Sequence, residues 1–447
     1  YSYLVFCTET FNRSPLNILS KNETFLLAEV QRMDRENILD EVFAHFLKGS
    51  KIFKNREVLR HDYVPDNLPH RREEILHLGE ITAPALRGSP CSNVFIYGKT
   101  GTGKTAVVKF VLNKLTQKAE EVGSPVKVCF VNCRLAGTEY RVLAALCSSI
   151  NVRVPFTGLA VGEIFDRFKK NLESQGIIFI VALDEIDALV KIRGDALLYE
   201  LTRINESLRQ SKVSIVGISN DLKFKDFLDP RVLSTLSEEE MVFKPYTAEE
   251  LQDILMERAK MAFYDGVLSE GALKLCAALA ASEHGDARRA LDLLRVAGEI
   301  AERRGDRKIA EEHVREAQER IEHDQVYESI KSLPTHSKIV LLSVYFLNKV
   351  DPNRSVTGDI YNLYLELCEQ IGITPLTQRR VSGLINELDV MGLLNSRVVS
   401  LGRYGRTKKI SLGIPRKIIF DVFSEDDRFR SLMSYKSKYL SQQLDNA

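Results

Sequence analysis

The chain has 447 residues, 44% of them hydrophobic and 28% charged, and its formal net charge at pH 7 is +1. This length and composition predict a globular protein of about two to four domains and exclude a fibre or a disordered tail, while the net charge identifies no partner. The longest apolar run, Ile177 to Leu183, is much shorter than the ~20 residues of a membrane-spanning helix, and no secretion signal opens the chain. We therefore expect a cytoplasmic protein without a membrane partner, whose seven cysteines are reduced thiols.

The N-terminal region carries the weakest signals. Residues 1–50 show one amphipathic stretch and are treated as an N-terminal extension. A Pro-rich extended passage, Asp62 to Arg71, follows, and a helix is predicted from about Arg72.

The next segment carries the strongest motif. Gly98 to Thr105 fits G-x-x-x-x-G-K-[ST], between an apolar strand, 93–97, and an amphipathic helix. In such a loop the backbone N–H groups point inward and the helix dipole adds positive charge, so the motif predicts a phosphate site. Lys104 can reach the β- and γ-phosphates and Thr105 can ligate Mg²⁺, so the predicted cofactors are ATP or ADP and Mg²⁺. The loop residues expected to bind are Gly101, Thr102, Gly103, Lys104, Thr105 and Ala106.

Two alternatives stay open at this point. The loop could be a structural glycine-rich turn, although such a turn needs neither the Lys nor the Thr. The Pro-rich passage before the loop could fold over the nucleotide base, or it could be an ordinary connection.

Two further predicted strands end in polar side chains. Residues 177–183 form an apolar strand followed by Asp184 and Glu185, and the strand 213–220 ends at Asn220. In a doubly wound parallel sheet these ends emerge beside the phosphate loop. Asp184 is expected to hold the Mg²⁺ hydration shell, Glu185 to polarise the attacking water and Asn220 to contact the γ-phosphate. A surface acidic pair is the alternative, but the seven apolar residues before it disfavour that interpretation.

Two arginines extend the predicted catalytic set beyond Lys104, the acidic pair and Asn220. Arg231 follows the asparagine strand by about ten residues and is expected at the edge of the α/β domain, where it could enter a neighbouring subunit's site. Arg288 opens a helix in the helical region 245–320 and can return over the phosphates. Either arginine could instead be a solvated charge.

The last part of the chain has the pattern of a winged helix-turn-helix. Helical periodicity over 335–350, 357–371 and 377–391 is followed by two short strands, 396–400 and 408–412. A basic, glycine-containing turn joins the strands and forms the wing. The expected helix N-caps are Thr335, Thr357 and Thr377.

Charge and periodicity predict DNA contacts for this domain. The segment 375–420 has nine Lys or Arg residues and two Asp or Glu residues. A basic turn is often only a solvated face, but here it accompanies a helix with a polar outward side, so we predict phosphate contact by the wing and base contact by the helix. The expected inward residues of that helix are Val381, Leu384, Ile385, Leu388 and Met391. The expected DNA-binding residues are Gln378, Arg379, Arg380, Ser382, Asn386, Arg403, Tyr404, Gly405, Arg406 and Lys408.

AAA+ ATPases carry five elements in a fixed order: Walker A, Walker B, sensor 1, a trans-acting arginine and sensor 2. This chain resembles them in the same order, with the phosphate loop, the acidic pair, Asn220, Arg231 and Arg288. The chain further resembles the archaeal origin-recognition initiators, relatives of the largest subunit of the eukaryotic origin recognition complex and of its helicase-loading partner. The passages that carry this resemblance are Ile52 to Asn55, Asp62 to Arg71, Gly285 to Arg295 and the C-terminal hairpin. It implies nucleotide contacts by Tyr246 and Arg258, and we expect Val64 in the Pro-rich passage to join them.

The spacing between two motifs reveals an insertion. Lys104 to Asp184 spans eighty positions, more than a strand, two helices and short loops need. The surplus, 152–163, resembles the initiator-specific insertion that touches DNA in the family, although its tip could be a plain loop. The resemblance implies DNA contacts by Arg153, Phe156, Thr157 and Gly158.

We predict an α/β P-loop AAA+ domain with a parallel sheet, a helical lid and a C-terminal winged helix. The expected boundaries are 1–50 for the extension, 51–244 for the AAA+ domain, 245–320 for the lid, 321–425 for the winged helix and 426–447 for a tail. The expected function is an ATP-dependent, nucleoid-associated replication initiator that binds duplex origin DNA, with slow hydrolysis as a switch. The resemblance implies the replicative minichromosome maintenance helicase and another copy or paralogous initiator as partners. A clamp-loader-like subunit, or a signalling ATPase with a scaffold winged helix, is the alternative.

Overall fold

The computed structural model describes residues 49–439, except 62, 64, 66, 156, 351–354, 401–405, 436 and 438. The chain divides into two compact units, and the division in the sequence falls between His313 and Val314. Among the predicted site residues, Val64, Phe156, Arg403, Tyr404 and Gly405 lie outside the described residues, as do residues 1–48; for Arg406 only the backbone is described. No helix in the described part of the chain is long and apolar enough to cross a membrane.

The first unit is built on a parallel five-stranded sheet with the order β2-β3-β4-β1-β5. Its strands are β1 Val94–Gly98, β2 Val126–Asn132, β3 Ile178–Asp184, β4 Lys212–Ser219 and β5 Glu239–Phe243. The inner strand β3 is buried along its whole length, because both of its faces are covered by helices. This arrangement confirms the predicted α/β domain.

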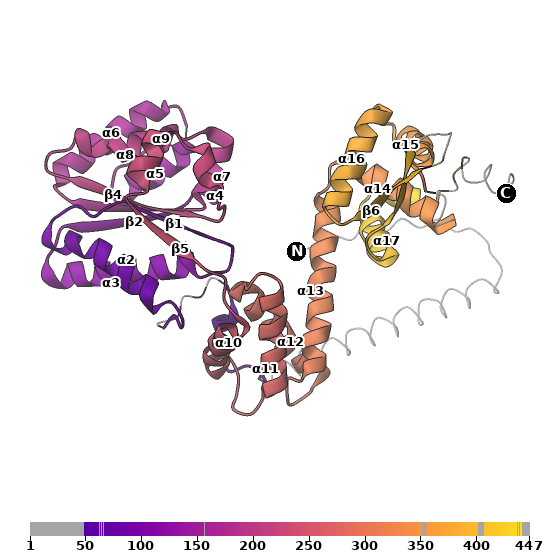
Figure 1. Cartoon of the computed structure of the whole chain (residues 1–447), viewed down its shortest axis with the longest axis horizontal. Helices are drawn as coiled ribbons and strands as arrows, with labels where there is room; N and C mark the ends of the chain where they lie inside the picture. Colours follow the sequence, from indigo (N-terminus) through magenta and orange to yellow (C-terminus); the bar gives the residue numbers. More distant parts are fainter. Residues whose placement is uncertain are drawn as a thin grey trace, which may run out of the picture. The chain divides into compact units, whose positions relative to one another are not determined.

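Helices pack on both faces of this sheet (Figure 1). On β3, Ile178, Ile180 and Ala182 join the core under α2 and α3, whereas Phe179, Val181 and Leu183 join the core under the remaining helices. The helices are α2 Arg72–Thr82, α3 Lys104–Val122, α4 Cys133–Ala136, α5 Glu139–Ser149, α6 Val161–Gln175, α7 Ile186–Arg193, α8 Ala196–Arg203 and α9 Pro230–Leu236. Short 3-10 helices are η1 Arg56–Leu59, η2 Ala83–Arg87, η3 Ile204–Glu206 and η4 Phe224–Phe227.

The lid consists of α10 Ala248–Ala262, α11 Glu270–Ser282 and α12 Ala287–Arg304. Residues 50–60 pack on these lid helices: Lys54 N donates to Ala262 O over 2.7 Å, and the rings of Phe53 and Phe263 lie 5.1 Å apart. The described part of the chain therefore begins on the lid, crosses to the sheet at α2 and returns to the lid after β5. Two separate segments connect the sheet and the lid.

The second unit contains the predicted winged helix. Its elements are α14 Thr335–Val350, α15 Thr357–Ile371, α16 Gln378–Val390, β6 Leu394–Ser400, β7 Arg406–Leu412, α17 Arg416–Glu425 and α18 Arg430–Met433. β6 and β7 pair antiparallel. The polar helix α13 Glu311–Ser332 runs across the boundary between the units.

Three local predictions for this unit are wrong. α14 and α15 include Thr335 and Thr357 as first helical residues, so these are not N-caps; Thr377 is one, since its side chain accepts from Arg380 N. Met391, predicted to face inward, is 61% exposed because α16 ends at Val390 and the chain then turns. The other four predicted inward residues of α16 are buried.

Candidate functional site

The phosphate loop begins where β1 ends at Gly98 and closes where α3 begins at Lys104. Gly101 and Gly103 have φ of 70° and 88°, left-handed values that favour glycine, and they let the backbone curl around a ligand. The Lys104 ammonium donates to Gly98 O over 2.8 Å and to Lys99 O over 2.6 Å. A loop that brings the Lys104 ammonium close to the N–H groups of a helix N-terminus is suited to binding a polyphosphate.

Lys104 is buried beside other charges. Burial, and then repulsion from Arg288, lowers the pKa of Lys104 to about 8, although Asp184 and two other carboxylates oppose the shift. An incoming anion would raise this pKa again, because an opposite charge beside the ammonium favours its charged form.

The lid packs directly against the phosphate loop. A Cβ on Gly101 would overlap the Asp286 carboxylate, and one on Gly103 would lie 2.6 Å from the Tyr246 hydroxyl. Ala287 N also donates to Gly101 O over 3.1 Å. Larger side chains at these glycines would therefore push the lid away.

The acidic pair lies opposite the loop. The Thr105 hydroxyl is 3.2 Å from both carboxylate oxygens of Asp184, which is 5% exposed, and burial raises the pKa of Asp184. Glu185 has φ 51° and ψ 44°, a strained conformation for a residue other than glycine, and Arg134 Nη1 lies 3.6 Å from its carboxylate. Hydroxyl and carboxylate oxygens are ligands that Mg²⁺ prefers, so the donor set fits that ion.

Asn220 is held by a residue that the sequence analysis missed. Asp187 Oδ1 accepts a hydrogen bond from Asn220 N over 3.2 Å and one from the Ser219 hydroxyl over 3.1 Å. Asp187 lies in the first turn of α7, just after the acidic pair, and it fixes the end of β4 beside the cavity. The signal available in the sequence was only a third carboxylate two residues after Glu185.

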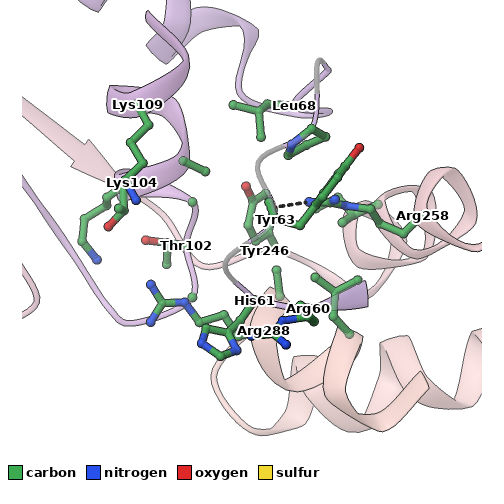
Figure 2. A pocket seen from close by; sticks show the side chains of 18 of the residues that line it. Arg60, His61, Tyr63, Leu68, Thr102, Lys104, Lys109, Tyr246, Arg258 and Arg288 are labelled. Atoms are coloured by element: carbon green, nitrogen blue, oxygen red, sulfur yellow. Dashed lines mark hydrogen bonds between the residues drawn. The ribbon is translucent and has the colours of Figure 1, made fainter. Parts of the chain in front are cut away.

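The phosphate loop, the acidic pair and Asn220 line a cavity of about 410 Å³ between the sheet and the lid (Figure 2). Residues from the Pro-rich passage, including Tyr63, Pro65 and Leu68, form one wall, while Ile254 and Leu291 come from the lid. The predicted residues in its lining are Gly101, Thr102, Gly103, Lys104, Thr105, Ala106, Asp184, Glu185, Asn220, Tyr246, Arg258 and Arg288. The described residues of this passage thus line the cavity, which favours the interpretation that it folds over a bound nucleotide.

Arg258 has a mainly structural set of contacts. It is 8% exposed, donates to Val58 O over 3.2 Å and to Tyr63 O over 3.3 Å, and lies 4.8 Å from the Tyr63 ring centroid. Burial lowers its pKa. Figure 2 shows the bond to Tyr63, by which Arg258 holds the Pro-rich passage on the lid.

Arg231 is not part of this cavity. It lies exposed in the first turn of α9, where its N–H donates to Asp229 Oδ1 over 2.8 Å. Its side chain is therefore accessible for a contact outside its own cavity.

The predicted DNA contacts lie in two places. On α16, Gln378, Arg379, Arg380 and Asn386 are exposed and Ser382 is half-buried. Lys408 of β7 donates to Asn386 Oδ1 over 2.5 Å, so this helix and the wing strand share a polar contact. Between α5 and α6, Arg153, Thr157 and Gly158 are exposed, and the Tyr140 hydroxyl donates to Pro155 O.

Three family models match the chain. They are an AAA domain over residues 87–222, a Cdc6 AAA+ ATPase-type lid domain over 252–319 and a CDC6 C-terminal winged helix domain over 328–422. The ORC1-type DNA replication protein of Thermococcus onnurineus is 53% identical over 403 residues, 89% of this chain and 97% of that protein. The chain belongs to this family of ORC1-type DNA replication proteins.

Other members of the family agree with this assignment. The Pyrococcus furiosus ORC1-type protein is 53% identical over 404 residues, 90% of this chain and 96% of that protein. The solved structure of Aeropyrum pernix ORC1 in complex with DNA is 52% identical, with a TM-score of 0.77 over 86% of this chain and all of that one. The phosphate loop and the acidic pair that line the cavity lie within the matched AAA domain, and the family decides against a clamp-loader subunit or a signalling ATPase.

Proposed function

We propose that this chain is an ATP-dependent replication initiator that binds duplex origin DNA, with its ATP or ADP state as the switch. One observation carries the proposal: a chain 52% identical to an ORC1 protein solved with DNA has a cavity lined by its phosphate loop, its acidic pair and lid Arg288. ORC1-type proteins act in DNA replication, as their name states.

The residues of the cavity suggest how nucleotide is bound and hydrolysed. Lys104 binds the β- and γ-phosphates, and Thr105 with Asp184 holds Mg²⁺, which when bound would neutralise charge on the phosphates. Glu185 polarises the attacking water, and Asn220 orients it against the γ-phosphate. Arg288 senses the phosphates from the lid, since it belongs to α12.

In this proposal DNA is bound at two places, the winged helix and the segment 152–163. The exposed polar side of α16 reads base edges, and the wing that joins β6 to β7 contacts phosphates. The segment 152–163 adds contacts through Arg153 and its neighbours. Once on DNA, the protein helps recruit or load the replicative minichromosome maintenance helicase. A second copy can supply its Arg231 to the nucleotide site of this chain, and a paralogue can supply the corresponding arginine.

The proposal is tested by titrating wild-type protein against duplex origin DNA and a shuffled duplex of the same length, at several salt concentrations. Each titration is run with ATP and with ADP. We expect tighter binding to origin DNA, an affinity that falls with salt, and a difference between the two nucleotides. Equal binding to both duplexes would contradict an origin-specific function.

A further inference from the structure

Two chain segments connect the sheet domain to the lid, and one buried side chain lies where they meet. The first, residues 60–71, leaves the lid at η1 and enters α2. Along it, Asn67 Nδ2 donates to Glu257 Oε1 and His70 Nε2 contacts Asp253 Oδ2, both over 2.9 Å on α10. The second, residues 244–247, joins β5 to α10.

Arg71 ends the first segment and is 4% exposed. Its Nε donates to Thr102 O in the phosphate loop over 3.0 Å, and its Nη2 donates to Lys244 O in the second segment over 2.6 Å. Its Nη1 pairs with Glu74 at 3.1 Å. The guanidinium carbon lies 3.9 Å from the centroid of the Tyr246 ring.

We propose that Arg71 is a positioning residue that couples the phosphate loop to the lid. This inference rests on the proposed nucleotide function and deepens it. Arg71 is not one of the residues that line the cavity, so it acts through the backbone groups that it holds. It joins three segments, the phosphate loop and both connections to the lid.

The bond to Thr102 O has a direct consequence for phosphate binding. The carbonyl of Thr102 and the N–H of Gly103 belong to one planar trans peptide unit, so they point in opposite directions. By holding the carbonyl on the side away from the cavity, Arg71 orients the Gly103 N–H toward the phosphates. A change in that peptide unit on phosphate binding or loss is then passed to Lys244.

Arginine is the side chain that these contacts require. Its planar guanidinium donates in three directions within one plane while its face stacks on an aromatic ring. A lysine keeps the charge but not the fork or the stacking face. A lysine side chain at this position cannot therefore hold Thr102, Lys244 and Tyr246 at once, which makes Arg71→Lys an informative variant.

The test is deuterium uptake of the full-length chain at saturating Mg-ATP, at saturating Mg-ADP and without nucleotide. Peptides covering 98–105, 244–250 and 285–291 report the phosphate loop, the second connection and the start of α12. The variants are Arg71→Ala and Arg71→Lys, with Arg72→Ala as the matched control, because Arg72 is exposed in the next position. ATP affinity is measured by calorimetry to set saturating concentrations.

In wild type and Arg72→Ala, ATP should lower uptake in all three peptides, and more than ADP does. In Arg71→Ala we expect ATP to bind about tenfold more weakly, since a charged hydrogen bond is lost. At saturation it should still protect the phosphate loop but not the other two peptides. Arg71→Lys should behave similarly, and it decides the question if Arg71→Ala does not fold.

Wild-type protection of all three peptides in both Arg71 variants at saturating ATP would overturn the coupling role. An ATP effect absent from wild type itself would contradict the proposed nucleotide function, and this inference with it. The two failures are distinct, because the first keeps wild-type ATP binding and the second does not.

Discussion

Lys104 and Arg288 bring two positive charges to the walls of one cavity, one from the phosphate loop and one from the lid. Burial is the main cause of the lowered pKa of Lys104, and repulsion from Arg288 is the second. The two cations therefore oppose each other until an anion lies between them. The lid should close more readily when a triphosphate is bound than when the cavity holds only water.

This relationship predicts a pH dependence of ATP binding. The pKa of Lys104 is about 8, so its ammonium is mostly charged at pH 7 and mostly neutral at pH 9 in the free protein. Because phosphate binds the charged form, ATP affinity should fall by about tenfold between these pH values. Arg288→Ala removes a charge that lowers this pKa, so the fall should move to higher pH. Calorimetric titrations at four pH values test this, and an unchanged midpoint in the variant would contradict it.

Removing single groups should separate binding from hydrolysis. Lys104→Ala removes the cation at the β- and γ-phosphates and should weaken ATP binding by at least about tenfold. Glu185→Gln keeps the shape of the side chain and should retain binding while abolishing hydrolysis. ATP titration and phosphate release measure the two effects. ATP affinity in Lys104→Ala equal to that of wild type would refute the assignment of the site.

Asp187 should matter for turnover more than for binding. Asp187→Asn weakens the acceptor for Asn220 N and the Ser219 hydroxyl, so Asn220 is less well placed. We expect a loss of about tenfold in kcat with little change in ATP affinity. Asp166→Asn is a control, since Asp166 is an exposed residue of α6. A drop in ATP affinity as large as the drop in kcat would mean that Asp187 holds the whole site together.

The two predicted catalytic arginines should differ when variants are mixed. Arg231 lies away from its own cavity, so an Arg231→Ala chain keeps an intact site that a neighbour can complete. A Lys104→Ala partner that retains Arg231 should therefore restore its ATP turnover when both assemble on DNA. Arg288→Ala should not be rescued, because Arg288 acts within its own chain. Turnover in the mixtures is the measurement, and failure of rescue despite demonstrated assembly would exclude a role in trans.

The sequence was sufficient for the parts of the site whose signals are local. The phosphate loop and the acidic pair each combine a short motif with an adjoining apolar strand. The strand order then brings their ends together, as predicted for a parallel sheet.

Contacts over long sequence separations could not be predicted in this way. Arg71 bonds to residues 31 and 173 positions away, and nothing in its local pattern indicates either partner. The packing of residues 50–60 on the lid likewise depends on partners near Ala262. The misplaced caps and Met391 have a different cause: periodicity locates a helix better than it locates the ends.

The central claim is that this chain binds a specific duplex origin in a nucleotide-dependent way. Footprinting on the genomic DNA of its own source, with ATP and with ADP, tests it most directly. Wild type should protect a defined site. Arg379→Ala should lose the discrimination between that site and random DNA. A double variant, Arg403→Ala with Arg406→Ala, should bind all DNA more weakly, and its affinity should depend less steeply on salt. Lys104→Ala should give the same footprint with and without ATP. Uniform protection along the DNA, unaffected by nucleotide, would contradict the account.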